Sequence, residues 1–190
     1  MHKDESDIGL IELVRKSLKD AFEKADQAEH EFPENPETVS GVFVTLKHDG
    51  MLRGCRGCVE GRFPLHQTVW EIARSSAFDD PRFDPLTRRE LEDLEISVSL
   101  LGEMESVDVE DPSQFQKLLR LGRDGICLRL QGRSALFLPE VATEQGWDVE
   151  TTLSRLCRKA GLEEEEWRNP ETEILRFQTK HLEALDAFRN

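Results

Sequence analysis

Apolar residues recur along the chain with two spacings, one typical of helices and one typical of strands. An amphipathic helix beginning near Ser6 or Asp7 is predicted by apolar residues at three- and four-residue intervals: Ile11, Val14, Leu18, Phe22 and Ala25. Alternation over 42–47 followed by Asp49-Gly50 predicts a β-hairpin whose second strand begins at Met51. The remaining elements are predicted in this order: a helix over 65–77, a short helix after a Thr87–Glu90 capping box, a strand over 95–101, a helix after Asp111-Pro112, a hairpin over 126–138, a helix capped by Asp148 and ending at Gly161, and a last strand over 173–180 before a short amphipathic tail.

The order helix, hairpin, helix, strand occurs twice, with a division near 102–111. We therefore predict one domain over 1–190 with lobes of roughly 1–105 and 106–190. A cryptic duplication is a further hypothesis, although the halves share no residue-level repeat. Antiparallel hairpins mixed with helices indicate the α+β class rather than a doubly wound sheet. Because the chain has no glycine-rich phosphate loop of dinucleotide or P-loop spacing, it gives nucleotide chemistry no support.

Charge narrows the classes of partner. The 190 residues include 39 acidic and 25 basic side chains, a formal net charge of −14, which opposes non-specific binding to nucleic acid or to an anionic membrane. No uncharged run approaches the roughly 18 residues that a membrane span needs. The charged start of the chain and its four cysteines fit neither a secretory signal nor a disulfide scaffold, so we expect a cytoplasmic protein.

The strand that leaves the first hairpin turn contains the unusual run Leu52-Arg53-Gly54-Cys55-Arg56-Gly57-Cys58. Glycines weaken a strand, so two of them in a short one usually mark a bulge or a close approach to the backbone. Either a ligand approaches the backbone here, or the glycines only relieve a twist or admit a neighbouring helix, and the sequence does not choose between these two explanations.

Cys55 and Cys58 have the spacing of a thiol–disulfide centre or of half a zinc site. Three positions along a regular strand place the two sulfur atoms on opposite faces, and no second cysteine or histidine pair completes a zinc site. We therefore predict no metal and no cofactor.

On a regular strand Arg53 and Cys55 share a side, and a guanidinium group beside a thiol favours the thiolate. Cys55 is thus the candidate nucleophile, the alternative being an inert buried cysteine. From Arg53 to Arg89 seven arginines face five carboxylates, a local balance of +2, which suggests recognition of a small anion. Arg82 lies in a rigid turn, where it can pair with Asp80 or reach a ligand.

Two carboxylates are candidates in the second half of the chain. Glu140 and Glu144 stand four residues apart, so on a short helix they share one face and can bind a cation or act in proton transfer. A solvated helix face gives the same pattern.

Several motifs together resemble those of the AMMECR domain family over about 39–177. They are Leu52-Arg53-Gly54-Cys55-x-Gly57, Ser76-Ala77-x-x-Asp80-Pro81-Arg82-Phe83, the segment from Leu138 to Asp148, and Arg158-Lys159-Ala160-Gly161. The segment Glu140 to Asp148 is most similar to the archaeal and eukaryotic branch. Two residues depart from the family pattern: Arg56 stands where isoleucine is usual, and Cys58 where a small hydroxyl residue is usual.

The resemblance implies an α+β protein of two unequal lobes, with the Arg-Gly-Cys strand beside the cleft between them. It also implies partners, because many bacterial relatives are the A component of the AmmeMemoRadiSam set, together with a Memo-type protein and a radical S-adenosylmethionine enzyme. The family motif carries over to these positions: Arg53, Gly54, Cys55, Gly57, Asp80, Arg82 and Phe83.

Two functions remain open. In the first, Cys55 attacks or carries an electrophilic small molecule while Arg53 and Arg82 hold its anionic group. His48 or Glu144 would then be the base, if the fold brings either close. In the second, the protein is a non-catalytic binding or adaptor module for a small anion or for a Memo-like or radical S-adenosylmethionine partner.

Overall fold

The computed structural model describes residues 5–23, 41–59 and 64–184. It divides into two compact units, one formed by Met1–Leu101 with Lys180–Asn190 and the other by Gly102–Thr179. The predicted lobes, 1–105 and 106–190, differ from these units in two ways. The first unit ends a few residues earlier, at Leu101, and the chain returns to it from Lys180 onward. Ala25 and the end of the predicted tail lie outside the described residues.

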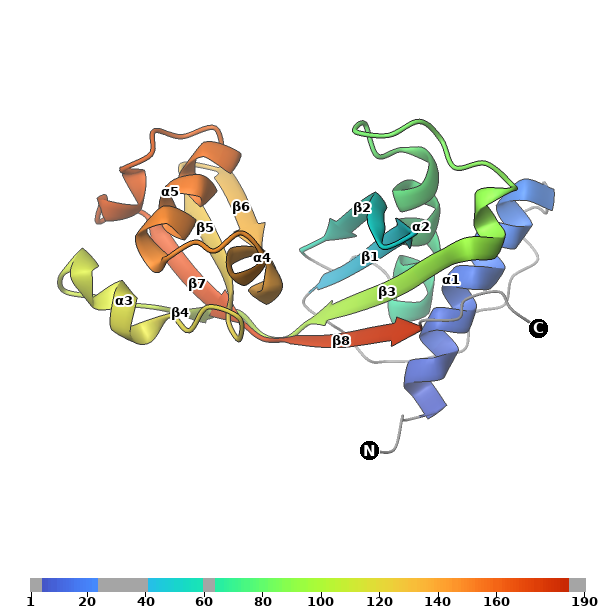
Figure 1. The fold of residues 1–190 in the computed structure, drawn as a ribbon. Helices are drawn as coiled ribbons and strands as arrows, with labels where there is room; N and C mark the ends of the chain where they lie inside the picture. Colours follow the sequence, from blue (N-terminus) through green and yellow to red (C-terminus); the bar gives the residue numbers. More distant parts are fainter. Residues whose placement is uncertain (1–4, 24–40, 60–63, 185–190) are drawn as a thin grey trace. The chain divides into compact units, whose positions relative to one another are not determined.

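The first unit contains an antiparallel sheet with the strand order β2-β1-β3-β8 (Figure 1). Its elements are α1 (Glu5–Glu23), β1 (Gly41–His48), β2 (Met51–Cys58), α2 (Leu65–Phe78), the 3-10 helix η2 (Glu90–Asp93), β3 (Leu94–Leu101) and β8 (Thr179–Ala184). The predicted first helix, hairpin, second helix and third strand are all present. Neither helix of this unit, nor any other described helix, is long and apolar enough to cross a membrane.

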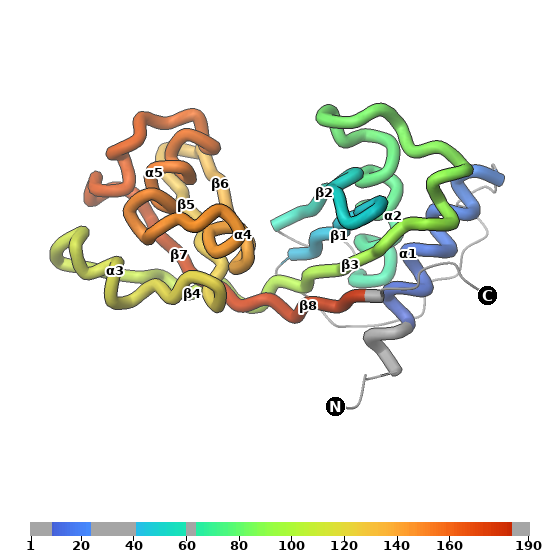
Figure 2. The backbone as a smooth tube through the Cα atoms, in the orientation of Figure 1, coloured from blue at the N-terminus to red at the C-terminus, as the bar shows by residue number. Residues whose placement is uncertain are grey.

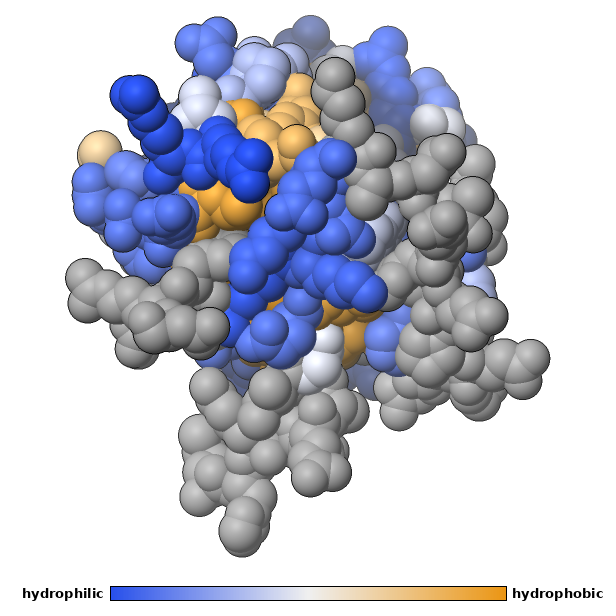
Figure 3. Space-filling view, turned by 90° about the vertical axis from the view of Figure 1, so that its right-hand side faces the viewer, coloured by the Kyte–Doolittle hydropathy of each residue, from blue (hydrophilic) through white to orange (hydrophobic). Residues whose placement is uncertain are grey.

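One face of this sheet packs against α1 and α2. The core consists of alternate strand residues and one stripe of each helix, including Val14, Leu18, Val44, Val69, Ala73, Ile96 and Val98. Figure 3 shows the side of this unit on which α1 lies in Figure 1, and the described residues there are mostly hydrophilic, with apolar atoms visible only between them. The helical and strand periods of the sequence thus mark the buried positions correctly.

The second unit contains another antiparallel sheet, with the order β4-β7-β5-β6. Its elements are β4 (Glu105–Ser106), η3 (Pro112–Gln114), α3 (Phe115–Leu118), β5 (Gly125–Leu130), β6 (Arg133–Phe137), α4 (Pro139–Glu144), α5 (Val149–Lys159), η4 (Glu166–Arg168) and β7 (Glu173–Phe177). The Asp148 carboxylate caps α5 by accepting from the Thr151 amide at 2.8 Å, and Gly161 adopts a φ of 73° after that helix. Both signals are confirmed.

The two units share one connectivity. In each, a hairpin is followed by a helix and then by a strand that pairs with the first hairpin strand: β1, β2, α2 and β3 in one, β5, β6, α5 and β7 in the other. The α+β class is confirmed. The cryptic duplication stays a hypothesis, with which this shared connectivity is consistent.

The predicted last strand over 173–180 is two strands. Residues 173–177 form β7 in the second unit, whereas 179–184 form β8 beside β3 in the first, as the red end of the tube in Figure 2 shows. Alternation along a strand does not show where its pairing partner changes. The prediction therefore treated β7 and the start of β8 as one strand, and assigned the rest of β8 to the amphipathic tail.

The two glycines of β2 are explained by the protein's own packing. A Cβ atom on Gly54 would lie 2.1 Å from the backbone oxygen of Ser76 in α2, and a Cβ atom on Gly57 would lie 2.3 Å from the ring of Phe43. Of the two possibilities that the sequence left open, approach of a neighbouring element accounts for both positions.

Replacement of Gly54 by alanine should therefore destabilise the fold. We expect Gly54→Ala to lower the free energy of unfolding by about 3 kcal/mol, because backbone rather than a flexible side chain must move to admit the methyl group. Gly9→Ala, at an exposed position in α1 with open space around it, should instead raise stability by about 1 kcal/mol. Urea unfolding of both variants checks this, and an unchanged stability of Gly54→Ala would contradict the packing explanation.

Candidate functional site

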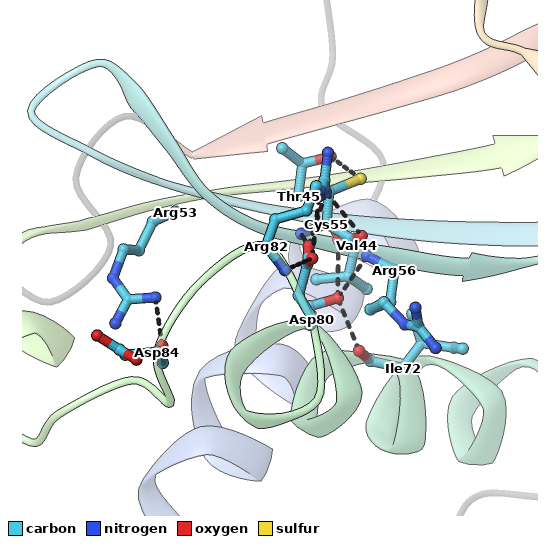
Figure 4. A network of polar contacts seen from close by, with 10 residues as sticks. Val44, Thr45, Arg53, Cys55, Arg56, Ile72, Asp80, Arg82 and Asp84 are labelled. Atoms are coloured by element: carbon cyan, nitrogen blue, oxygen red, sulfur yellow. Dashed lines mark hydrogen bonds and ion pairs between the residues drawn. The ribbon is translucent and has the colours of Figure 1, made fainter. Parts of the chain in front are cut away.

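The turn after α2 holds the backbone of Cys55 from both sides. The Asp80 carboxylate accepts a hydrogen bond from the Cys55 amide at 2.9 Å, and Arg82 Nη2 donates to the Cys55 carbonyl at 3.3 Å (Figure 4). Asp80 and Arg82 are themselves paired through two contacts, Nε to Oδ1 at 2.9 Å and Nη2 to Oδ2 at 2.7 Å. Of the two outcomes predicted for Arg82, pairing with Asp80 is the one found.

This ion pair changes the titration of its members. Only 3% of the Asp80 side chain is exposed, and the hydrogen bonds from Arg82 and from the Cys55 amide hold the pKa of Asp80 well below its ordinary value despite burial. The same hydrogen bond to Asp80 raises the pKa of Arg82. Both groups are therefore charged throughout the physiological range.

Ser76 fastens α2 to the same part of the sheet. Its hydroxyl accepts from the Arg56 amide at 3.0 Å and lies 2.9 Å from the carbonyl oxygen of Val44 in β1 and 2.8 Å from that of Ile72. Together with the close approach at Gly54, this contact seats the last turns of α2 on the hairpin. Ser76 belongs to the quoted motif, and these hydrogen bonds give the buried hydroxyl a structural role.

Arg53 points away from the Cys55 thiol. The β1–β2 register shifts at this point, Leu46 pairing with Gly54 and Lys47 with Leu52, so Arg53 is an extra residue in a bulge. Its guanidinium group binds Glu90 at 2.6 Å and the Asp84 carbonyl at 2.9 Å, with only 17% of the side chain exposed. The prediction that Arg53 lies beside the thiol assumed regular alternation, and the bulge makes it wrong.

Glu90 is the partner that sequence reasoning did not assign to Arg53. Its carboxylate also accepts from the amide of Thr87 at 2.8 Å, which is half of the predicted capping box. Hydrogen bonds from Arg53, and then from Thr87, lower the pKa of Glu90 to about 2. Arg53 thus joins β2 to the segment that leads into β3.

The Cys55 side chain is half-buried and directed toward the neighbouring strand. Its Sγ lies 3.3 Å from the hydroxyl oxygen of Thr45 in β1, and either group can be the donor. Within the described ranges no histidine or carboxylate is hydrogen-bonded to this thiol. The arrangement offers an accessible thiol beside a hydroxyl group, without an adjacent base.

Cys58 lies on the opposite face of the strand, as predicted. It pairs in register with Val42 of the core face, whereas Cys55 pairs with Thr45, and both thiols are free. Among the residues that the structure describes, no group of three or more histidine, cysteine or carboxylate side chains could hold a metal ion.

The other two cysteines differ in exposure. Cys127 and Cys157 are buried in the second unit, where desolvation raises the pKa of each thiol. Reactivity is therefore expected at Cys55 and Cys58 first.

A polar row on the face of Thr45 escaped the sequence analysis. Thr45 pairs with Ser97 and Phe43 with Ser99 of β3, and the Ser99 hydroxyl lies 3.1 Å from Nδ1 of His181 in β8. The alternation of Ser97 and Ser99 along β3 could have indicated this row. The contact with His181 depends on the pairing of β8 with β3, which the sequence pattern does not show. In the sheet, β1 and β3 lie between β2 and β8. Because neighbouring strands are about 4.8 Å apart, His181 in β8 is too far from Cys55 in β2 for a hydrogen bond.

The two candidate bases lie elsewhere in the chain. His48 ends β1, with Nδ1 3.5 Å from the Asp49 carboxylate. Glu144 is exposed at the end of α4 in the second unit, so the short helix that the pairing of Glu140 with Glu144 assumed is present. Neither is hydrogen-bonded to Cys55.

The ion pair at Asp80 should make stability depend on pH. The folded pKa of Asp80 lies below the unfolded value of about 4, so the stabilisation is complete well above the unfolded value, declines as the pH falls below it, and is lost as the pH passes through the lower folded pKa. We expect Asp80→Asn to lose about 2 kcal/mol at pH 7 and to show a shallower decline below about pH 5. Asp79→Asn, at an exposed neighbour, is the matched control. Parallel pH profiles of urea unfolding for Asp80→Asn and the wild type would contradict this assignment.

Comparison with known proteins places this geometry in a family. The sequence model of the AMMECR1 family matches residues 11–182. A protein from Methanothermobacter thermautotrophicus is 44% identical over 140 residues, covering 74% of this chain and 73% of its own length, and one from Thermofilum pendens is 36% identical over 90% of this chain and 86% of its own. The crystal structure of the uncharacterized protein PH0010 from Pyrococcus horikoshii is similar with a TM-score of 0.85 and 33% identity, covering 94% of this chain and 91% of that one. The chain belongs to the AMMECR1 family.

Proposed function

We propose that Cys55 is the functional group of this protein, as the thiol of an enzyme or of one subunit of an enzyme system. The observation that supports this proposal is the fixing of one residue by an ion pair, Asp80 on its amide and Arg82 on its carbonyl. Because the Asp80 carboxylate is buried and is bound both by Arg82 and by the Cys55 amide, these contacts fix the backbone position of Cys55. The thiol itself stays half-exposed.

The substrate class follows from the charge beside the thiol. The Arg82 side chain is 55% exposed, and its Nη1 makes no hydrogen bond to any described residue. This nitrogen is available to the anionic group of a small electrophilic molecule that Cys55 attacks. The thiol proton passes to water, since no side-chain base among the described residues is hydrogen-bonded to Sγ. The thiolate then adds across a polarised double bond of the molecule, whose electron pair takes up a proton from water.

The other predicted site residues have supporting roles in this proposal. Gly54, Gly57 and Asp80 position the strand, and Arg53 joins it to Glu90 instead of contacting the substrate. Participation of Glu144, and a cytoplasmic location in keeping with four free cysteines, stay predictions.

A second candidate is a non-catalytic binding or adaptor module. It is favoured by one specific observation: among the described residues, the only side chain hydrogen-bonded to the thiol is the neutral Thr45 hydroxyl. In this case the surface around Cys55 binds a small anion or a Memo-like or radical S-adenosylmethionine protein.

Alkylation with reagents of different charge tests the first candidate. Iodoacetate is anionic and iodoacetamide is neutral, so the ratio of their rates at Cys55 reports the nearby positive charge. We expect this ratio to fall about threefold in Arg82→Gln, and to stay near the wild-type value in Arg82→Lys and in the control Arg88→Gln, whose side chain is 72% exposed. Site-resolved mass spectrometry follows each cysteine.

Two outcomes would count against the first candidate. Alkylation of Cys55 no faster than that of the buried Cys127 would show an inaccessible thiol, and an unchanged ratio in Arg82→Gln would remove Arg82 from the site. Co-purification of a Memo-type or radical S-adenosylmethionine protein that survives Cys55→Ala would favour the adaptor.

A further inference from the structure

The second unit contains a hollow of about 500 Å³ that the proposed function does not use. It lies between the loop before β4, helix α3 with the turn that follows, and the end of β7. Its lining includes Glu103, Lys117, Leu118, Arg120, Arg123 and Gln178. Ligand sites in proteins commonly have volumes of about 300–1,000 Å³.

Four cations and three carboxylates line this hollow, an excess of +1 in a chain whose net charge is −14. Arg176 is paired with Glu105 at 2.9 Å, and Arg123 Nε lies 4.0 Å from Asp124. Lys117 and Arg120 have no ion pair and no side-chain hydrogen bond with the described residues. Unpartnered cations at a concave surface of an acidic protein indicate a complementary anion.

The turn that carries the arginines is rigidly built. Asp124, only 6% exposed, accepts from the Arg120 amide at 2.9 Å, and its own amide donates to the Arg120 carbonyl at 2.8 Å. Gly122 has a φ of 81°, which favours glycine, and its amide donates to the Pro139 carbonyl at 3.2 Å. The backbone positions of Arg120 and Arg123 are thereby fixed before any ligand binds.

Gln178 adds a neutral donor to the hollow. With its amide oxygen turned to Arg123, this oxygen accepts from Nη2 at 2.9 Å and from Nε at 3.1 Å. The amide nitrogen, turned away from Arg123, is then the hydrogen-bond donor of this side chain. Glu103, the one lining carboxylate without a partner among the described residues, can accept a hydroxyl or ammonium hydrogen of the same ligand.

We propose that this hollow binds a small organic anion through its phosphate or carboxylate groups, with Lys117, Arg120 and Arg123 as the cationic contacts. Guanidinium forks match the paired oxygens of both groups, and the lysine supplies a compact charge. Leu118, 40% exposed, offers an apolar surface to the body of the ligand. The site belongs entirely to the second unit and does not depend on Cys55.

Isothermal titration calorimetry of the full chain with pyrophosphate and with citrate tests this proposal. We expect at least one of them to bind, and Arg120→Gln and Lys117→Gln each to weaken it about tenfold. Arg88→Gln, an exposed arginine in the first unit, and Cys55→Ala should leave the affinity unchanged. Tighter binding of pyrophosphate would identify a phosphate ligand, and tighter binding of citrate a carboxylate ligand.

Two results would overturn the proposal. One is the absence of binding by both probes at about 1 mM, and the other is an affinity unchanged in both pocket variants. Thermal unfolding without ligand shows whether each variant is folded, and Arg120→Lys, which keeps the charge, should recover part of the lost affinity. Retention of binding in Cys55→Ala separates this site from the thiol proposal.

Discussion

The contact between the turn at 79–83 and the edge strand β2 determines how the hairpin, the end of α2 and Cys55 are held together in the first unit. An edge strand presents unpaired amide and carbonyl groups that invite another chain to pair with it. Here the Asp80 carboxylate and the Arg82 guanidinium group occupy those groups at Cys55, while the Ser76 hydroxyl links the Arg56 amide to the Val44 carbonyl of β1. Together these contacts protect the edge, seat α2 on the hairpin and fix the backbone of the half-buried Cys55.

A similar contact is made to β6, an edge strand of the sheet in the second unit. Lys159, the last residue of α5, donates to the carbonyl of Leu136 in β6 at 2.9 Å, and its ammonium group lies 4.8 Å from the ring centroid of Phe137. In both units a cation that follows the hairpin in sequence binds a carbonyl of the second hairpin strand. The shared connectivity thus extends to how each sheet edge is covered, although the residues differ.

The sequence predicts what depends on near neighbours in the chain. The hairpin turn at Asp49-Gly50 and the cap at Asp148 follow from local spacing, and both are found. The partner of Arg53 is 37 residues away in Glu90, so no local pattern reveals it. The bulge that turns Arg53 aside leaves no mark in the alternation of side chains, and the position of His181 depends on a strand pairing across most of the chain.

The return of the chain through β8 makes the second unit an insertion between two strands of the first. Its two connecting segments touch, because the Gly102 amide donates to the Gln178 carbonyl at 2.9 Å. The entry and exit points of an insertion that lie this close can be bridged by a short peptide without opening the host sheet. Evolution can therefore exchange or remodel the inserted module while the thiol-bearing host keeps its own framework.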